Sequence, residues 1–142
     1  MTSPLITQLQ TRHGYPLLDA DSYDHFVYGN ESVVLFFCND PVQFPESNDV
    51  AVIFPELDKT FNGLLQAAVI EKSIERELQA RFRFTGWPSL VFLRNGEYLG
   101  VITGVRNWRE YRQEAAGILA SEPSEPPGFD LDKVCGGATL IM

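Results

Sequence analysis

Two kinds of apolar pattern alternate along the first half of the chain. Residues 32–38 (Ser-Val-Val-Leu-Phe-Phe-Cys) form an unbroken run of β-branched and aromatic residues, and residues 64–70 form a second apolar run. Such runs are typical of strands that are buried on both faces of a sheet. Between them, residues 39–48 contain two prolines and predict an irregular loop, whereas residues 49–61 have apolar positions at helical spacing. Pro55 falls inside that helix and is expected to kink it.

Further helices and strands are predicted up to residue 120. Residues 4–12 are amphipathic and predict a helix, and Leu17-Leu18 predicts a short strand. The order of elements from that strand onward, β-α-β-α-β-α-β-β-α, predicts a mixed sheet with helices on both faces. The other elements are a helix capped by Asp21 with Tyr23, Phe26 and Val27 on one face, a helix over 73–82, strands over 89–94 and 98–103, and a helix from an Asn107 cap to Leu119 with Trp108, Tyr111, Ala115 and Ile118 facing inward.

Residues 86–104 carry the most specific local pattern. Asn95-Gly96 separates two apolar strands, and both residues tolerate the positive φ of a type I′ hairpin turn. Trp87-Pro88 opens the first strand, and Gly104 ends the second. This segment resembles the C-terminal half of the thioredoxin fold, in which a cis-proline precedes the hairpin. The resemblance implies an α/β protein, a three-layer α/β/α sandwich with a mixed sheet of four to five strands and a cis-proline at Pro88.

The chain is acidic, and its charges are unevenly distributed. The formal net charge is −8, which argues against nucleic acid as a partner. The window from His13 to Asp58 contains no Lys or Arg. It provides either a solubilising surface or a face that meets a cationic peptide or protein, and both interpretations stay open. Its acidic residues are Asp19, Asp21, Asp24, Glu31, Asp40, Glu46, Asp49, Glu56 and Asp58.

Length and composition favour one domain followed by a distinct C-terminal segment. A chain of 142 residues that is 44% hydrophobic is most simply a single domain, which we place at residues 1–120. Residues 121–142 begin with a Pro/Glu/Ser-rich linker and end in an apolar, glycine-rich stretch, either a loose terminus or a docking segment. No apolar run approaches the roughly 20 residues of a membrane-spanning helix, and the first residues lack an export-signal pattern. We therefore expect a cytoplasmic protein without membrane insertion.

The thiol pair of a redox-active thioredoxin is missing. Thioredoxins carry Cys-x-x-Cys at the start of the helix after the central strand, with a proline five residues beyond the second cysteine. Counting back from Pro55 places residues 47–50 there, and counting forward from the strand places residues 42–45 there; neither segment contains a cysteine. Cys38 ends a buried strand and is expected to be an inert core residue, with a monothiol nucleophile as the alternative. Cys135 has no partner near it in sequence.

Other signals of catalysis or cofactor binding are also missing from the sequence. The acid that many thioredoxins bury in the central strand is replaced by Phe36. His13 and His25 are not spaced as a metal pair with each other or with a cysteine. The chain has no Gly-x-Gly-x-x-Gly, Walker-type or Gly-x-Ser-x-Gly motif. We expect no enzymatic activity, no metal and no cofactor.

Taken together, these features resemble the HyaE/HupG/HoxO group of [NiFe]-hydrogenase expression and maturation proteins. The resemblance covers roughly residues 15–120 and is carried by residues 33–37, 45–61 and 84–104 and by Gly-Val-Arg-Asn-Trp at 104–108. It implies a non-redox chaperone that acts in the cytoplasm on the hydrogenase small-subunit precursor before export. Such proteins are associated with the twin-arginine signal peptide of the precursor and with other hydrogenase accessory proteins.

The resemblance and the charge distribution together give a partner-binding hypothesis. In the thioredoxin family the residue before the cis-proline, here Trp87, offers its backbone to an extended partner. Trp87 is either a core aromatic or an exposed anchor, and an acidic face suits a partner with paired arginines. Two other functions stay open, a monothiol thiol-disulfide oxidoreductase using Cys38 and a thioredoxin-like adaptor unrelated to hydrogenase. The candidate partner-binding residues are Glu46, Asp49, Glu56, Asp58, Phe44, Trp87 and Pro88.

Overall fold

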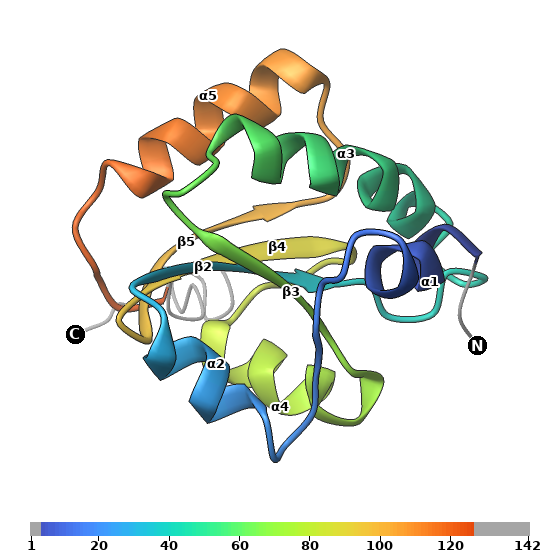
Figure 1. Cartoon of the computed structure of the whole chain (residues 1–142), viewed down its shortest axis with the longest axis horizontal. Coiled ribbons are helices and arrows are strands. Elements are labelled where there is room, and N and C mark those ends of the chain that lie inside the picture. The colour runs from blue at the N-terminus through green and yellow to red at the C-terminus, as the bar shows by residue number, and fades with distance from the viewer. Residues whose placement is uncertain (1–3, 127–142) are drawn as a thin grey trace, which may run out of the picture.

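A mixed five-stranded sheet forms the centre of the protein (Figure 1). The structure is a computed structural model and describes residues 4–126. The strand order is β1-β3-β2-β4-β5, in which β1, β3 and β2 are parallel and β4 and β5 are antiparallel to their neighbours. The elements are α1 (Pro4–Thr11), β1 (Leu17–Leu18), α2 (Tyr23–Gly29), β2 (Ser32–Phe37), α3 (Glu46–Thr60), β3 (Gln66–Ile70), α4 (Lys72–Phe82), β4 (Ser89–Arg94), β5 (Glu97–Thr103) and α5 (Trp108–Leu119).

Helices cover both faces of this sheet, as the element order predicts. Figure 1 shows α3 and α5 on one side and α2 and α4 on the other. α1 contacts α3, and its Ile6 and Leu9 join the same core as α3 and α5. Every residue of β2 is buried, because β2 is a central strand with helices on both sides. Its side chains alternate between two cores: Val34 and Phe36 join the core under α1, α3 and α5, and Val33, Leu35 and Phe37 join the core under α2 and α4. The thioredoxin-like three-layer α/β/α architecture is confirmed.

The β4–β5 hairpin and the proline before it have the predicted backbone. Asn95 and Gly96 have φ values of 52° and 82°, in the region that a type I′ turn requires. The Trp87–Pro88 peptide bond is cis, as predicted. Asn107 caps α5 through a capping box. The Asn107 side chain accepts from the Glu110 N–H at 2.9 Å, and the Glu110 side chain accepts from the Asn107 N–H at 3.0 Å.

Three local predictions were wrong. α3 begins at Glu46, inside the segment predicted as loop, because the Ser47 hydroxyl donates to the Cys38 carbonyl oxygen at 2.5 Å and holds the first turn against the end of β2. The N-cap of α2 is Ser22 and not Asp21, since the Asp19 carboxylate accepts from the N–H groups of both residues and forms a turn before the helix. Trp108 does not face inward: it is the first residue of α5 and is 36% exposed.

Residues 121–126 lie against the sheet. The Ser124 N–H donates to the Tyr98 carbonyl oxygen at 2.9 Å, and Arg94 donates to the Ser121 and Leu119 carbonyl oxygens at 3.0 and 2.5 Å. The start of the predicted C-terminal segment therefore covers part of the β5 edge. The rest of that segment, with Cys135, lies outside the described residues, so the division at residue 120 stays a prediction.

Candidate functional site

Several candidate residues lie at one end of the sheet, beside the amino end of β4. Phe37 pairs with Ser89, and Ser89 pairs with Thr103. Cys38, Pro88 and Gly104, which directly follow or precede these residues in the chain, therefore lie side by side at this end. We refer to Trp87, Pro88 and Gly104 as the rim. The carboxyl ends of the parallel strands β1 and β3 point to the same end of the sheet, because β2 is parallel to them.

The rim is held by hydrogen bonds but leaves one residue's backbone unused. The Gly104 N–H donates to the Pro88 carbonyl oxygen at 2.8 Å, and Gly104 has a φ of 83°. The Ser89 and Thr103 hydroxyls are 2.8 Å apart, and Ser89 also donates to the Gly86 carbonyl oxygen. Within residues 4–126 the backbone N–H and C=O of Trp87 make no hydrogen bond. These are the groups that an added strand would use.

The Trp87 side chain belongs to an aromatic cluster. Its ring centroid lies 5.1 Å from that of Phe84 in an edge-on arrangement and 6.4 Å from those of Phe37 and Phe44. Trp87 is half-buried and packs against the core under α2 and α4. It is therefore a core aromatic and a partly exposed surface at once. Phe44, on the loop before α3, is half-buried and extends this surface.

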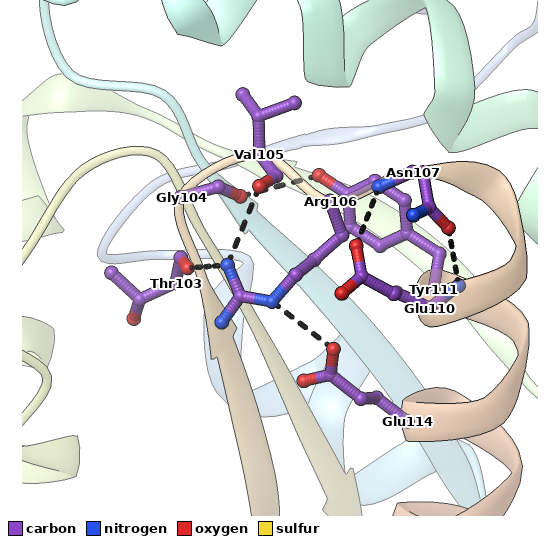
Figure 2. A network of polar contacts seen from close by, with 8 residues as sticks. All are labelled: Thr103, Gly104, Val105, Arg106, Asn107, Glu110, Tyr111 and Glu114. Carbon is purple, nitrogen blue, oxygen red and sulfur yellow. Dashed lines mark hydrogen bonds and ion pairs between the residues drawn. The ribbon is translucent and has the colours of Figure 1, made fainter.

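A polar network fixes the loop between β5 and α5 beside the rim (Figure 2). The Arg106 guanidinium donates to the carbonyl oxygens of Thr103 at 2.7 Å and Val105 at 3.4 Å, and it pairs with the Glu114 carboxylate at 3.0 Å. The Tyr111 hydroxyl donates to the Gly104 carbonyl oxygen at 3.2 Å. The loop is thus anchored to α5 at both ends, which positions Gly104 next to Pro88. Gly104, Val105, Arg106 and Asn107 of this network belong to the Gly-Val-Arg-Asn-Trp segment.

Only some of the acidic candidates lie near the rim. Glu46 and Asp49 occupy the first turn of α3, which follows Phe44 and the N-cap residue Pro45, and both are exposed. Glu56 is exposed about 15 Å further along the helix, by its rise of 1.5 Å per residue, and pairs with Lys59 at 3.6 Å. Asp58 is half-buried and accepts from the Tyr15 hydroxyl at 2.9 Å. Phe44, Trp87 and Pro88 therefore come together with Glu46 and Asp49, whereas Glu56 and Asp58 lie elsewhere.

The position of the missing cysteine pair agrees with the count back from Pro55. Residues 47–50 directly follow Glu46, the first residue of α3, and so lie at the start of the helix, where a redox helix would carry its thiols. Ser47 is fully buried, and its hydroxyl is engaged with the Cys38 carbonyl oxygen. The longer loop before α3 explains why the count forward from β2 ended too early.

Glu75 is a buried acid that the sequence analysis missed. It lies on α4, is 2% exposed, and its Oε2 accepts from the Asn39 N–H at 3.0 Å. Burial raises the pKa of this carboxyl, against the opposing effect of that hydrogen bond. Glu75, Leu78 and Phe82 are spaced i, i+3 and i+7, which places Glu75 on the apolar face of the helix. This spacing is the feature of the sequence that could have indicated its burial. From the sequence, Phe36 is expected at the position where many thioredoxins bury an acid. In this protein a buried acid reaches the end of β2 from α4.

Comparisons with known proteins identify the family. A family profile described as hydrogenase-1 expression protein HyaE matches residues 5–111. The chain belongs to the HyaE family. The hydrogenase expression/formation protein HoxO of Azotobacter vinelandii is 49% identical over 127 residues, which cover 89% of this chain and 85% of that protein. HoxO of Cupriavidus necator is 40% identical over 95% of this chain, and HupG of Rhizobium leguminosarum bv. viciae is 37% identical over 86%; both matches cover 85% of the relative.

Solved structures agree with this membership and with the fold. The crystal structure described as hydrogenase expression/formation protein HupG from Rhodopseudomonas palustris is 40% identical, with a TM-score of 0.53 over 74% of this chain and 95% of that one. Plasmodium falciparum thioredoxin has a TM-score of 0.58 over 74% of this chain and 95% of that one, at 14% identity, which shows the fold alone. This HyaE-family protein is a hydrogenase expression protein with a thioredoxin-like fold.

The chemistry of Cys38 in this HyaE-family protein differs from that of a redox thiol. Burial and the nearby Glu75 charge raise the pKa of Cys38 to about 12. A nucleophilic thiol needs the opposite, a depressed pKa at a helix N-terminus or beside a cation. The names of its HoxO and HupG relatives describe expression and formation proteins rather than a reaction.

Two further properties concern residues 4–126 of the HyaE-family chain. No group of three or more His, Cys, Asp or Glu side chains in this range is placed to hold a metal ion. None of the helices in the same range has the length and apolar character needed to cross a bilayer.

Proposed function

We propose that this protein is a non-redox accessory chaperone of [NiFe]-hydrogenase maturation. It binds the small-subunit precursor in the cytoplasm, before export, by recognising the twin-arginine signal peptide of the precursor. It acts there alongside other hydrogenase accessory proteins. The observation that carries the proposal is the unused Trp87 backbone on a rim that adjoins the acidic first turn of α3. Family membership supports the link to hydrogenase.

The rim supplies the binding mode. An extended peptide pairs with the Trp87 N–H and C=O as an added strand, and main-chain hydrogen bonds of this kind give affinity for many sequences. The exposed part of the Trp87–Phe44 cluster offers aromatic surface to side chains of the peptide. The cluster packs on the core and the Arg106 network holds the neighbouring loop, so the rim is already ordered before the peptide binds.

The acidic first turn supplies the preference for a cationic peptide. Glu46 and Asp49 are exposed and make no ion pair within residues 4–126. An arginine pair near the rim would meet these carboxylates, which favours encounter and register more than it adds raw affinity. Glu56 and Asp58 contribute to the general negative potential from further away.

The test is binding of a purified twin-arginine hydrogenase signal peptide by isothermal calorimetry, together with hydrogenase activity in cells. A variant with Glu46→Gln, Asp49→Asn, Glu56→Gln and Asp58→Asn should bind the peptide at least about tenfold more weakly at low salt. The Glu46/Asp49 pair alone should account for most of this loss. The matched control is Glu31→Gln with Glu97→Gln, which removes two exposed carboxylates at the opposite end of the sheet. Unchanged binding and unchanged hydrogenase activity in the fourfold variant would rule the proposal out.

A further inference from the structure

A cavity of about 150 Å³ lies at the carboxyl ends of β1, β2 and β3. Ile6 of α1, Leu17 of β1 and Val69 and Ile70 of β3 give it apolar walls. Cys38 and the buried Glu75 carboxyl also line it. Open α/β sheets characteristically bind ligands beyond the carboxyl ends of their parallel strands, and this cavity occupies that place.

Within the described residues Glu75 makes no ion pair, although the charge of the nearby Lys72 favours its ionised form. Within residues 4–126 no Lys, Arg or His nitrogen lies within ion-pairing distance of its carboxylate. Lys72 stands one helical turn earlier on α4 and also lines the cavity, but it is exposed and makes no ion pair with Glu75. One carboxyl oxygen is satisfied by the Asn39 N–H. Burying an acid beside apolar walls without an ion pair is costly, and such groups are concentrated at binding sites.

We propose that this cavity is a subsite for one arginine side chain of a bound peptide. Its apolar walls contact the methylene groups of the arginine, and the Glu75 carboxylate accepts from the guanidinium. A cavity of similar volume in another protein holds benzene, so a planar guanidinium fits the available space. Arginine suits the site better than lysine, because its guanidinium is more weakly hydrated and matches a carboxylate with two parallel donors.

The cavity is close enough to the rim to act with it. β2 neighbours β4 on one side and β3 on the other, and adjacent strands are about 4.8 Å apart. A peptide paired at Trp87 is therefore within one or two strand spacings of the cavity mouth, which is within reach of an arginine side chain. The inference rests on the proposed function in taking the peptide to be the signal peptide of the precursor; the arginine subsite itself is testable without it.

The probe is N-acetyl-L-arginine methylamide, titrated into the full-length protein at low ionic strength and followed by two-dimensional NMR. Binding should shift the signals of Leu17, Asn39 and Ile70. The citrulline analogue, which has the same shape without the charge, should bind at least about tenfold more weakly, since it loses a charged hydrogen bond. Glu75→Gln should weaken arginine binding by a similar factor while keeping an acceptor for the Asn39 N–H. Glu77→Gln, on an exposed position of the same helix, should leave it unchanged.

Lys72 provides a second charge test. Lys72→Ala removes a cation from the cavity lining and should strengthen arginine binding. Leu17→Trp, which fills the mouth without touching the Glu75 position, should weaken it even if Glu75→Gln proves too unstable to study. Equal affinity for the citrulline analogue, or signal shifts that map away from the cavity, would overturn the inference.

The signal peptide separates this inference from the proposed function. If the arginine probe binds at Glu75 but the signal peptide does not bind the wild-type protein, the proposed function fails and the subsite stands. If the signal peptide binds and Glu75→Gln leaves its affinity unchanged, the subsite fails and the proposed function stands.

Discussion

Arg106 should be the main support of the loop that carries Gly104. Its guanidinium donates to the Thr103 and Val105 carbonyl oxygens and pairs with Glu114, so Arg106→Ala removes all three interactions at once. The Glu114 pair is about one-third exposed on each side and is worth a few tenths to 1 kcal/mol. A hydrogen bond from a charged donor is worth about 1.5–3 kcal/mol when buried, and half-burial reduces this. We expect a total loss of about 1–2 kcal/mol in the free energy of unfolding.

Urea denaturation of the wild type and the variant measures this loss, since it compares midpoints at constant slope. Hydrogen exchange of the Gly104 amide measures the local consequence. That amide bonds to the Pro88 carbonyl oxygen, and it should exchange faster when the loop loses its anchor. Glu114→Gln removes only the ion pair and should cost less than half as much. Arg106→Lys keeps the positive charge but lacks the several N–H donors of the planar guanidinium, so it should be more stable than Arg106→Ala but less stable than the wild type. A change below about 0.5 kcal/mol with unaltered Gly104 exchange would refute this reasoning.

Three further predictions concern single residues. Gly104→Ala should destabilise the protein by about 1–2 kcal/mol in urea denaturation, because Gly104 has a φ of 83°. Gly117→Ala on α5 has open space around it and should stabilise the protein by about 0.5–1 kcal/mol. Equal effects of the two substitutions would contradict this. The folded-state pKa of Glu75 is raised above 4.5, so the folded protein binds more protons than the unfolded chain, and its stability should fall as pH rises through and above that value. The stability of Glu75→Gln should therefore rise relative to that of the wild type over the same pH range. Parallel pH profiles of the two proteins would contradict this. The Cys38 thiol, with a pKa of about 12, should react with a disulfide reagent at neutral pH far more slowly than after unfolding in urea, and equal rates would contradict this.

Much of the fold could be predicted because its signals are local. The unbroken apolar run at 32–38 identified the central strand, and Asn95-Gly96 identified the hairpin turn, since each depends on residues adjacent in the chain. The boundary at Glu46 could not be predicted in this way. It depends on the Ser47 hydroxyl reaching the Cys38 carbonyl oxygen, a contact that forms only when the loop closes.

The candidate site was likewise predictable only where its features depend on residue identity and spacing along the chain. The sequence placed Trp87 and Pro88 before the hairpin and showed that no cysteine pair precedes Pro55, because both are matters of residue identity and spacing. It grouped four acids by their nearness in the chain. The structure separates Asp58, turned toward Tyr15, from Glu46 and Asp49, because helical rotation sends nearby residues to different faces.

The sequence by itself determined the class of fold, the hairpin, the missing thiol pair and the negative charge, since each follows from composition or short-range pattern. Only the tertiary structure decided that Trp87 is at once core and surface, that Arg106 anchors the rim, and that Glu75 is buried beside Cys38. Each of these depends on side chains from different elements that meet through sheet pairing and helix packing. Separation along the sequence does not predict such contacts, because chain connectivity fixes which residues are neighbours along the backbone and not which are neighbours in space.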